Sequence, residues 1–118
     1  MQYLENIQPR ELFPGLHFRF VHGEASTLSF VTIEKGSKLH LHHHPHEQIT
    51  HVIEGELEMT IGNETMVLTP GSVYVIPGNT PHSAVALTEV KVIDFFSPAS
   101  TLLTPPIKAL PEPATFFG

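Results

Sequence analysis

The sequence predicts an all-β protein, a sandwich or barrel built from many short strands. Apolar and polar residues alternate over short segments, and glycine- or proline-containing turns separate these segments at regular spacing. No segment shows a convincing helical periodicity. The chain has 118 residues, which suits one domain with one modest core. We therefore expect a single domain over residues 1–118.

The expected strands follow one another along most of the chain. Leu16, Phe18 and Phe20 alternate with their neighbours, which indicates a strand with one buried face. The pair Gly62-Asn63 lies between two alternating segments and predicts a hairpin turn. The full set of expected strands covers residues 16–21, 28–33, 40–44, 48–53, 56–61, 65–68, 72–76, 83–87 and 90–96.

The composition changes from Ser97 onward, where prolines become frequent. These prolines exclude regular strand or helix in that region: Pro98, Pro105, Pro106, Pro111 and Pro113. We expect the core barrel at about residues 16–97 and an extended arm at about residues 98–118. The arm would pack on its own barrel or on a partner subunit.

Charge and composition exclude several classes of protein. The chain has six basic residues against twelve acidic ones, which argues against a nucleic-acid partner. No apolar run is long enough to cross a bilayer, and the N-terminal residues do not have the pattern of a signal peptide. The absence of cysteine excludes disulfides and a cysteine-based zinc site. We expect a cytoplasmic protein without nucleic-acid or membrane partners.

Six of the nine histidines lie between His40 and His51. A β-strand advances ~3.3 Å per residue and points alternate side chains to one face, so His42 and His44 would lie close enough to share a metal ion. Neutral imidazole is the commonest protein ligand for metals such as zinc, copper, iron and nickel. A solvated histidine-rich edge is the alternative interpretation. His40 has the same parity and is expected to form a wall of the pocket.

Two further residues are candidate ligands. Pro45 breaks the strand, and a three-residue turn brings the amide of Gln48 beside His44. His82 is far along the chain, but flanking turns would present it at the start of a strand.

Asp94 is the only aspartate in the chain and shares a strand face with Val90, Val92 and Phe96. A carboxylate on an apolar face is costly unless it is paired or used. Desolvation would raise its proton affinity, as a general acid or base requires, whereas a structural hydrogen bond is the alternative. Tyr74 is a second candidate in the barrel, either as a proton donor to substrate or as a packing residue.

Together these residues resemble the two motifs of the cupin family. The first motif matches at Gly36, His42, His44, Gln48 and Gly55, and the second at Gly71, Pro77 and His82, with departures at Asn79 and Ala86. The resemblance implies a jelly-roll barrel, a double-stranded β-helix, that pairs as a homodimer. It also implies one divalent transition metal ion, nickel, iron, manganese or zinc, held by His42, His44, Gln48 and His82.

Gln48 departs from the glutamate that most of the family carries. Three imidazoles and one amide leave the charge of a divalent cation uncompensated, which strengthens its Lewis acidity and favours anionic ligands. The two-histidine, one-carboxylate set of non-haem iron oxygenases is not reproduced. We therefore expect a metal-dependent isomerase or lyase acting on a small anionic substrate. A metal-dependent oxygenase and a non-catalytic small-molecule sensor are the alternatives.

A narrower resemblance covers residues 45–49 and 92–98. These segments are similar to small cupins that linearise 4,5-unsaturated uronates from pectin and alginate breakdown. The resemblance implies that Asp94 transfers the proton and that Phe96 forms a wall of the substrate pocket. It points to a sugar acid as substrate, with an oxo acid as the other option.

Overall fold

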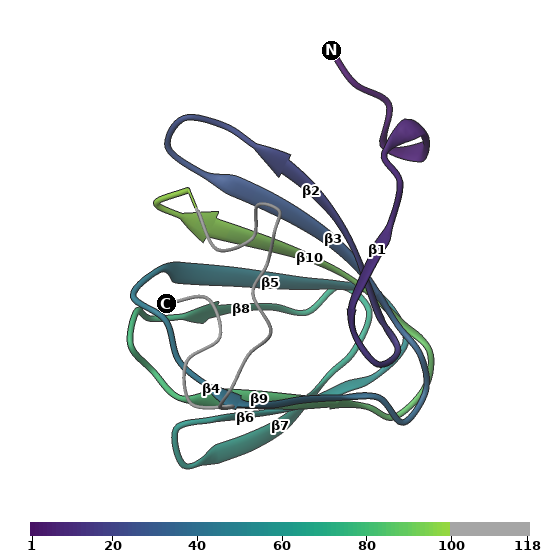
Figure 1. Cartoon of the computed structure of the whole chain (residues 1–118). Coiled ribbons are helices and arrows are strands. Elements are labelled where there is room, and N and C mark those ends of the chain that lie inside the picture. Colours follow the sequence, from purple (N-terminus) through teal and green to yellow (C-terminus); the bar gives the residue numbers. More distant parts are fainter. Residues whose placement is uncertain (100–118) are drawn as a thin grey trace.

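The computed structural model describes residues 1–99 and confirms the all-β prediction (Figure 1). A short 3-10 turn, η1 (Leu4–Asn6), precedes the strands. The ten strands are β1 (Arg10–Phe13), β2 (Leu16–His22), β3 (Thr27–Ile33), β4 (Lys38–His42), β5 (Glu47–Glu54), β6 (Leu57–Ile61), β7 (Glu64–Leu68), β8 (Val73–Ile76), β9 (His82–Ala86) and β10 (Val90–Ser97). Most of the expected C-terminal arm, residues 100–118, lies outside the described residues.

The strands form two antiparallel sheets that face each other across a common interior (Figure 1). One sheet has six strands in the order β1-β2-β3-β10-β5-β8, and the other has four in the order β4-β9-β6-β7. Strand β10 lies between β3 and β5, although both are distant from it in the sequence. This arrangement encloses a core between the sheets and places residues of β10 near the middle of one wall.

Buried and more exposed side chains alternate along the inner strands, most regularly in β3. In β3, every second residue from Thr27 to Ile33 is buried, as an alternating strand with one core face requires. Cross-strand pairing aligns the interior side chains in rows. One row is apolar and joins Val31, Val92 and Val52, whereas the next row joins Ser29, Asp94 and Thr50. The polar row therefore follows directly from the register that the apolar row fixes.

Strand pairing begins earlier than the expected barrel boundary at residue 16. Residues Arg10–Phe13 form β1, which pairs with β2 at the edge of the six-stranded sheet. The strand has four residues, and its register shifts between Glu11 and Phe13. A strand this short, with an irregular register, has no clear alternation in the sequence.

Two glycines hold turns that a side chain would disrupt. Gly62 opens the two-residue hairpin loop between β6 and β7 with φ of 59°, in the left-handed region that glycine tolerates. Gly55 has φ of 83°, and a Cβ there would collide with the carbonyl oxygen of Glu89. Gly55 therefore allows the end of β5 to approach the start of β10.

Among residues 1–99, no helix has the length and hydrophobicity that crossing a bilayer would require.

Candidate metal centre

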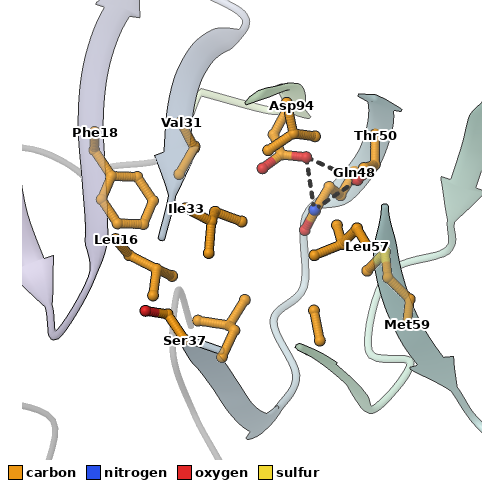
Figure 2. A pocket seen from close by; sticks show the side chains of 13 residues that line it. Leu16, Phe18, Val31, Ile33, Ser37, Gln48, Thr50, Leu57, Met59 and Asp94 are labelled. Atoms are coloured by element: carbon orange, nitrogen blue, oxygen red, sulfur yellow. Dashed lines mark hydrogen bonds between the residues drawn. The ribbon is translucent and has the colours of Figure 1, made fainter. Parts of the chain in front are cut away.

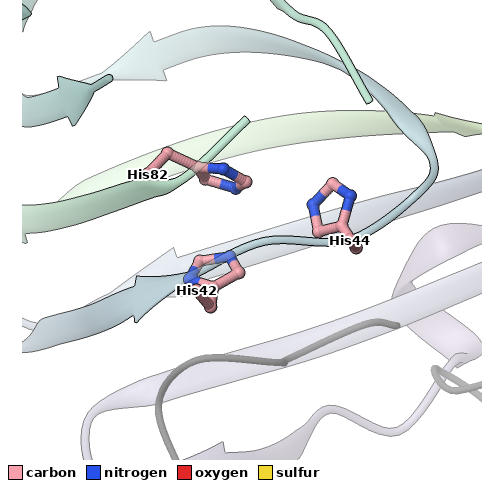
Figure 3. A group of neighbouring side chains, drawn as sticks. All are labelled: His42, His44 and His82. Carbon is pink, nitrogen blue, oxygen red and sulfur yellow. The ribbon is translucent and has the colours of Figure 1, made fainter. Parts of the chain in front are cut away.

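Three histidine rings converge inside the barrel, and two segments of chain bring them together (Figure 3). His42, His44 and His82 are each at most 1% exposed. The ring centroids are 4.1 Å apart for His42 and His82, 5.0 Å for His44 and His82, and 5.8 Å for His42 and His44. One nitrogen from each ring lies within 4.8 Å of the others. These three residues could therefore hold one metal ion.

The backbone of two loops fixes the relative position of the histidines. His42 at the end of β4 is the cross-strand partner of His82 at the start of β9. The backbone N–H of Asn79 donates to the carbonyl oxygen of His44 at 2.6 Å, and this hydrogen bond connects the β8–β9 loop to the β4–β5 loop. Asn79 has φ of 62°, a left-handed conformation that asparagine adopts more readily than most residues. The asparagine that replaces the motif glycine thus keeps the turn.

Each of the three rings is oriented by a backbone carbonyl near it in the sequence. The Nδ1 atom of His42 lies 2.7 Å from the oxygen of His40, that of His44 lies 3.0 Å from the oxygen of His46, and that of His82 lies 2.8 Å from the oxygen of Thr80. Because a carbonyl only accepts, each Nδ1 carries the hydrogen, and in the neutral ring Nε2 carries the lone pair. Metal-ligating histidines are typically oriented in this way.

Burial keeps the three imidazoles neutral. Desolvation, followed by the nearby His82, lowers the pKa of His42 to about 3 and the pKa of His44 to about 4. Desolvation also lowers the pKa of His82. The buried Nε2 of His82 has no hydrogen-bond partner among residues 1–99. Neutral rings with Nε2 lone pairs are the form in which histidine binds metal.

The contact between the side chains of Gln48 and His44 indicates whether a cation would fit between them. The Oε1 atom of Gln48 lies 3.1 Å from Nε2 of His44. The amide nitrogen of Gln48 donates to Thr50 Oγ1 at 2.9 Å and to Asp94 Oδ1 at 3.1 Å, which fixes the oxygen toward the histidine. Two lone pairs then face each other, and a cation bound by both atoms would turn this repulsion into attraction. The donor set therefore fits a divalent transition metal.

Asp94 contacts the amide nitrogen of Gln48, whereas His44 contacts the amide oxygen. Its Oδ1 accepts hydrogen bonds from Thr50 Oγ1 at 2.8 Å and from Gln48 Nε2. Desolvation raises the pKa of Asp94 to about 6, against the opposing effect of these two donors. The sequence predicted the direction of this shift. A carboxyl group with a pKa near neutrality can both take up and release a proton at physiological pH.

The three residues expected to contact substrate, Phe96, Tyr74 and His40, have different surroundings in the structure. Phe96 is buried, and its ring centroid is 5.7 Å from that of His44. Tyr74 is half-buried, packs against the core and pairs across the strands with Thr50. His40 is exposed, and its contribution to the triad is its backbone carbonyl.

Sequence reasoning placed His46 in a turn and missed its burial. The side chain is 7% exposed, and its ring centroid lies 5.8 Å from that of His44. Desolvation lowers the pKa of His46. Its parity with His42 and His44 was the available signal, but Pro45 made alternation an unreliable guide there. Thr50 was also missed, although it lies two residues after Gln48 on the same strand face.

The family model and the similar solved structures indicate the same protein family for this chain. A model described as "Cupin domain" matches residues 29–96. Among solved structures, an RmlC-like cupin from Shewanella frigidimarina NCIMB 400 superposes with a TM-score of 0.84 at 27% identity, covering 88% of this chain and 95% of that chain. The structure of KdgF from Halomonas sp. superposes with a TM-score of 0.78 at 31% identity, covering 81% and 92%.

The curated relatives match over shorter segments. The pectin degradation protein KdgF of Dickeya dadantii (strain 3937) is 40% identical over 57 residues, which are 48% of this chain and 52% of that protein. This chain spans about half, or less, of the length of the curated relatives it matches.

Proposed function

The chain belongs to the cupin family, and from that membership we propose that it is a metal-dependent isomerase or lyase acting on a small anionic substrate. One observation carries the proposal: Gln48 joins the histidine triad to a carboxylic acid. Its amide oxygen faces His44, and its amide nitrogen donates to Asp94. The side chain of Gln48 thus connects the proposed metal site to the proposed proton-transfer group, Asp94.

The residues of the proposed centre have separable roles. His42, His44, His82 and Gln48 would hold the ion, and a divalent ion bound there would supply Lewis acidity toward an oxygen of the substrate. Thr50 and Gln48 hold Asp94 Oδ1, and its pKa of about 6 suits transfer of a proton to or from carbon or oxygen. Phe96 packs beside His44 and would exclude water from one side of the substrate.

The charge of the donor set supports an anionic substrate. Three neutral imidazoles and one amide bring no negative charge to the ion, so a carboxylate or an enolate is attracted to it. The similarity to KdgF proteins favours a 4,5-unsaturated uronate, and the match to a protein named H2HPP isomerase is compatible with other isomerisations. Redox-neutral chemistry is favoured over oxygen chemistry because the carboxylate that completes oxygenase iron sites is replaced by Gln48.

Metal content and turnover test this function together. Untagged protein is analysed for nickel, iron, manganese and zinc, and then reloaded with each metal. Turnover of 4,5-unsaturated uronates and of 2-oxo acids is followed by NMR, alongside oxygen uptake. We expect one metal ion per chain, and turnover by the loaded wild type but not by Asp94→Asn. Oxygen uptake that depends on the metal would contradict the proposal, and so would Asp94→Asn with full turnover.

We also propose that the chain pairs as a homodimer. The edge strand β8 carries exposed apolar side chains, Val73 at 58% and Val75 at 48%, and Ile53 on neighbouring β5 is 41% exposed. Edge strands of this kind invite pairing with another chain, and a second copy can pair with its own equivalent edge. Light scattering that gives the mass of a single chain would contradict this proposal.

A further inference from the structure

The barrel interior holds little free space on the side that Leu16 and Phe18 of β2 line (Figure 2). A cavity there has a volume of about 30 Å³, whereas an engineered apolar cavity that binds benzene has about 150 Å³. Gln48 and Asp94 border the same cavity, and Leu57 of the facing sheet is part of its wall. A substrate bound at the metal centre therefore has no room to extend in this direction.

The interior face of β2 becomes exposed toward its other end. Leu16 and Phe18 are buried, whereas Phe20 is half-buried and His22 is exposed. These four residues share one face of the strand because their positions differ by two. The rings of Phe18 and Phe20 stack with centroids 5.5 Å apart, and those of Phe20 and His22 stack at 5.8 Å. The interior therefore opens to solvent at the end where His22 lies.

Cross-strand pairing places His22 at the same level of the six-stranded sheet as the metal centre. His22 pairs with Thr27 on β3, which pairs with Phe96 on β10. Phe96 in turn pairs with Gln48 on β5. The four strands lie side by side in Figure 1. His22 and the proposed ligand Gln48 are therefore the two ends of one interior row.

Ring contacts follow the same path from the metal centre to the open end. The ring centroid of Phe96 lies 5.7 Å from that of His44. Phe96 also packs against Phe20, and Phe20 stacks on His22. A substrate that extends from the triad toward solvent would therefore pass these rings and reach His22.

One nitrogen of His22 is held by the barrel, and the other is open to a ligand. The Nδ1 atom lies 3.0 Å from Oγ1 of Thr27, which is fully buried. When this hydroxyl donates to Nδ1, the ring hydrogen is at Nε2. No other hydrogen bond of the His22 ring occurs among residues 1–99. Nε2 can therefore donate to an acceptor that enters from solvent.

The surroundings of His22 leave it as the group that would bind an anion at this end. In the part of the chain that the structure describes, the interior-facing residues of β2, β3, β5 and β10 include no lysine or arginine. A carboxylate accepts hydrogen bonds and has no hydrogen to donate, so it suits the Nε2–H group of His22.

We propose that His22 binds the carboxylate of the substrate at the end remote from the metal, and that several carbons of the substrate separate this carboxylate from the oxygen at the metal. This inference rests on the proposed function, because it assumes that the metal centre binds an oxygen of the substrate. It favours a uronate, whose carbonyl and carboxylate are at opposite ends, over a 2-oxo acid, in which the two groups are adjacent.

The spacing of the strands separates these two classes of acid. Neighbouring strands are about 4.8 Å apart, so the three steps from β2 to β5 place the Cα atoms of His22 and Gln48 about 14 Å apart along the sheet. Both side chains extend into the interior, which shortens the gap between them. Adjacent carbonyl and carboxylate groups cannot reach both ends of this row, whereas groups at opposite ends of a sugar acid can.

The experiment compares the binding of three small molecules to zinc-loaded protein by calorimetry. Galacturonate has a carboxylate remote from its carbonyl end, its methyl ester lacks the negative charge, and 2-oxohexanoate has the two groups adjacent. We expect the wild type to bind galacturonate at least about tenfold more tightly than the ester, because hydrogen bonds to a charged group are among the strong ones. His22→Ala should remove this difference and change the affinity for 2-oxohexanoate by no more than about twofold.

Two further variants separate a role of His22 from a general effect on the strand. His17 lies on the opposite face of β2 and contacts Glu34, so His17→Ala is the matched control and should change nothing. Thr27→Val removes the hydroxyl beside Nδ1 and should weaken galacturonate binding by less than His22→Ala does. Because His22 is exposed, its truncation should not prevent folding, and equal zinc content checks this.

Several outcomes would overturn the inference and leave the proposed function standing. They are equal binding of galacturonate and its ester by the wild type, a difference that persists in His22→Ala, and an equal loss of 2-oxohexanoate binding in that variant. Binding of 2-oxohexanoate without binding of galacturonate would also overturn it. If neither acid binds the loaded protein, the anionic substrate of the proposed function fails as well.

Discussion

The polar site inside the barrel has two neighbouring ends, the histidine triad and Asp94, which differ in how their polar groups are held. At one end, three histidine rings are fixed by backbone carbonyls close to them in the sequence. At the other end, Asp94 is held by side chains from β5, which is 44 to 46 residues away in the sequence. Gln48 connects the two ends. The difference indicates that the orientation of each histidine ring depends on local structure, whereas the position of Asp94 depends on the register between β5 and β10.

Removing a ligand of the histidine end should have the largest effect. His82→Ala removes one Nε2 donor from a fully buried set, so we expect metal affinity to fall by more than about 100-fold and turnover to be lost. Competition with a chelator measures the affinity. His43→Ala is the matched control because His43 neighbours two of the triad histidines but is exposed. Unchanged metal content in His82→Ala would show that the triad is not the binding site.

Removing the acid at the other end should leave the metal in place. Asp94→Asn keeps an oxygen that accepts from Thr50 and Gln48 but abolishes proton transfer, so we expect kcat to fall by about 10²–10⁴-fold. Metal affinity should change by no more than a few-fold. A parallel loss of metal and turnover would show that the two ends are not separable.

The same substitution should stabilise metal-free protein at alkaline pH. The pKa of Asp94 is raised from 3.8 to about 6, so its contribution to stability is present below pH 4 and is lost as pH rises through 6. Asp94→Asn removes this loss, and we expect a gain of at most about 3 kcal/mol at pH 8. Urea unfolding at pH 5 and pH 8 measures it.

The histidines should act in the opposite direction. Their lowered pKa values give stability that is present above pH 6.5 and is lost as the pH falls toward 4 and 3. A gain for Asp94→Asn that is as large at pH 5 as at pH 8 would be inconsistent with a buried ionised carboxylate.

Changing the connecting residue should have the smallest effect and should affect both ends. Gln48→Glu adds a negative charge to the donor set, so we expect metal affinity to rise by about tenfold. It also replaces the amide that donates to Asp94 with a second carboxylate, which raises the pKa of Asp94 further. The pH of half-maximal turnover should therefore increase. A metal titration and a pH–rate profile measure the two effects, and a change in one without the other would remove Gln48 as the link.

Family membership and the all-β fold could be predicted because their signals are local. Alternation in segments such as Thr27–Ile33 and the spacing of the histidines are visible in the sequence, and the comparisons confirm the family. The ligand and substrate roles of individual residues remain predictions. The single domain and its boundaries also remain a prediction.

The features that sequence reasoning missed depend on tertiary contacts. Arg10–Phe13 is too short to show a period, and it is defined by pairing with β2. The burial of His46 results from the fold around Pro45, which interrupts alternation. The cavity beside Asp94 depends on volumes from both sheets, which no single strand specifies.

The carbonyls that orient the three rings each lie two residues from the histidine they contact. Short segments around His40–His46 and Thr80–His82 therefore contain both the donors and their supports. Such segments are portable units for protein engineering. Grafted onto another antiparallel barrel with the same spacing between β4 and β9, they should carry the nitrogen donors in their working orientation without further redesign.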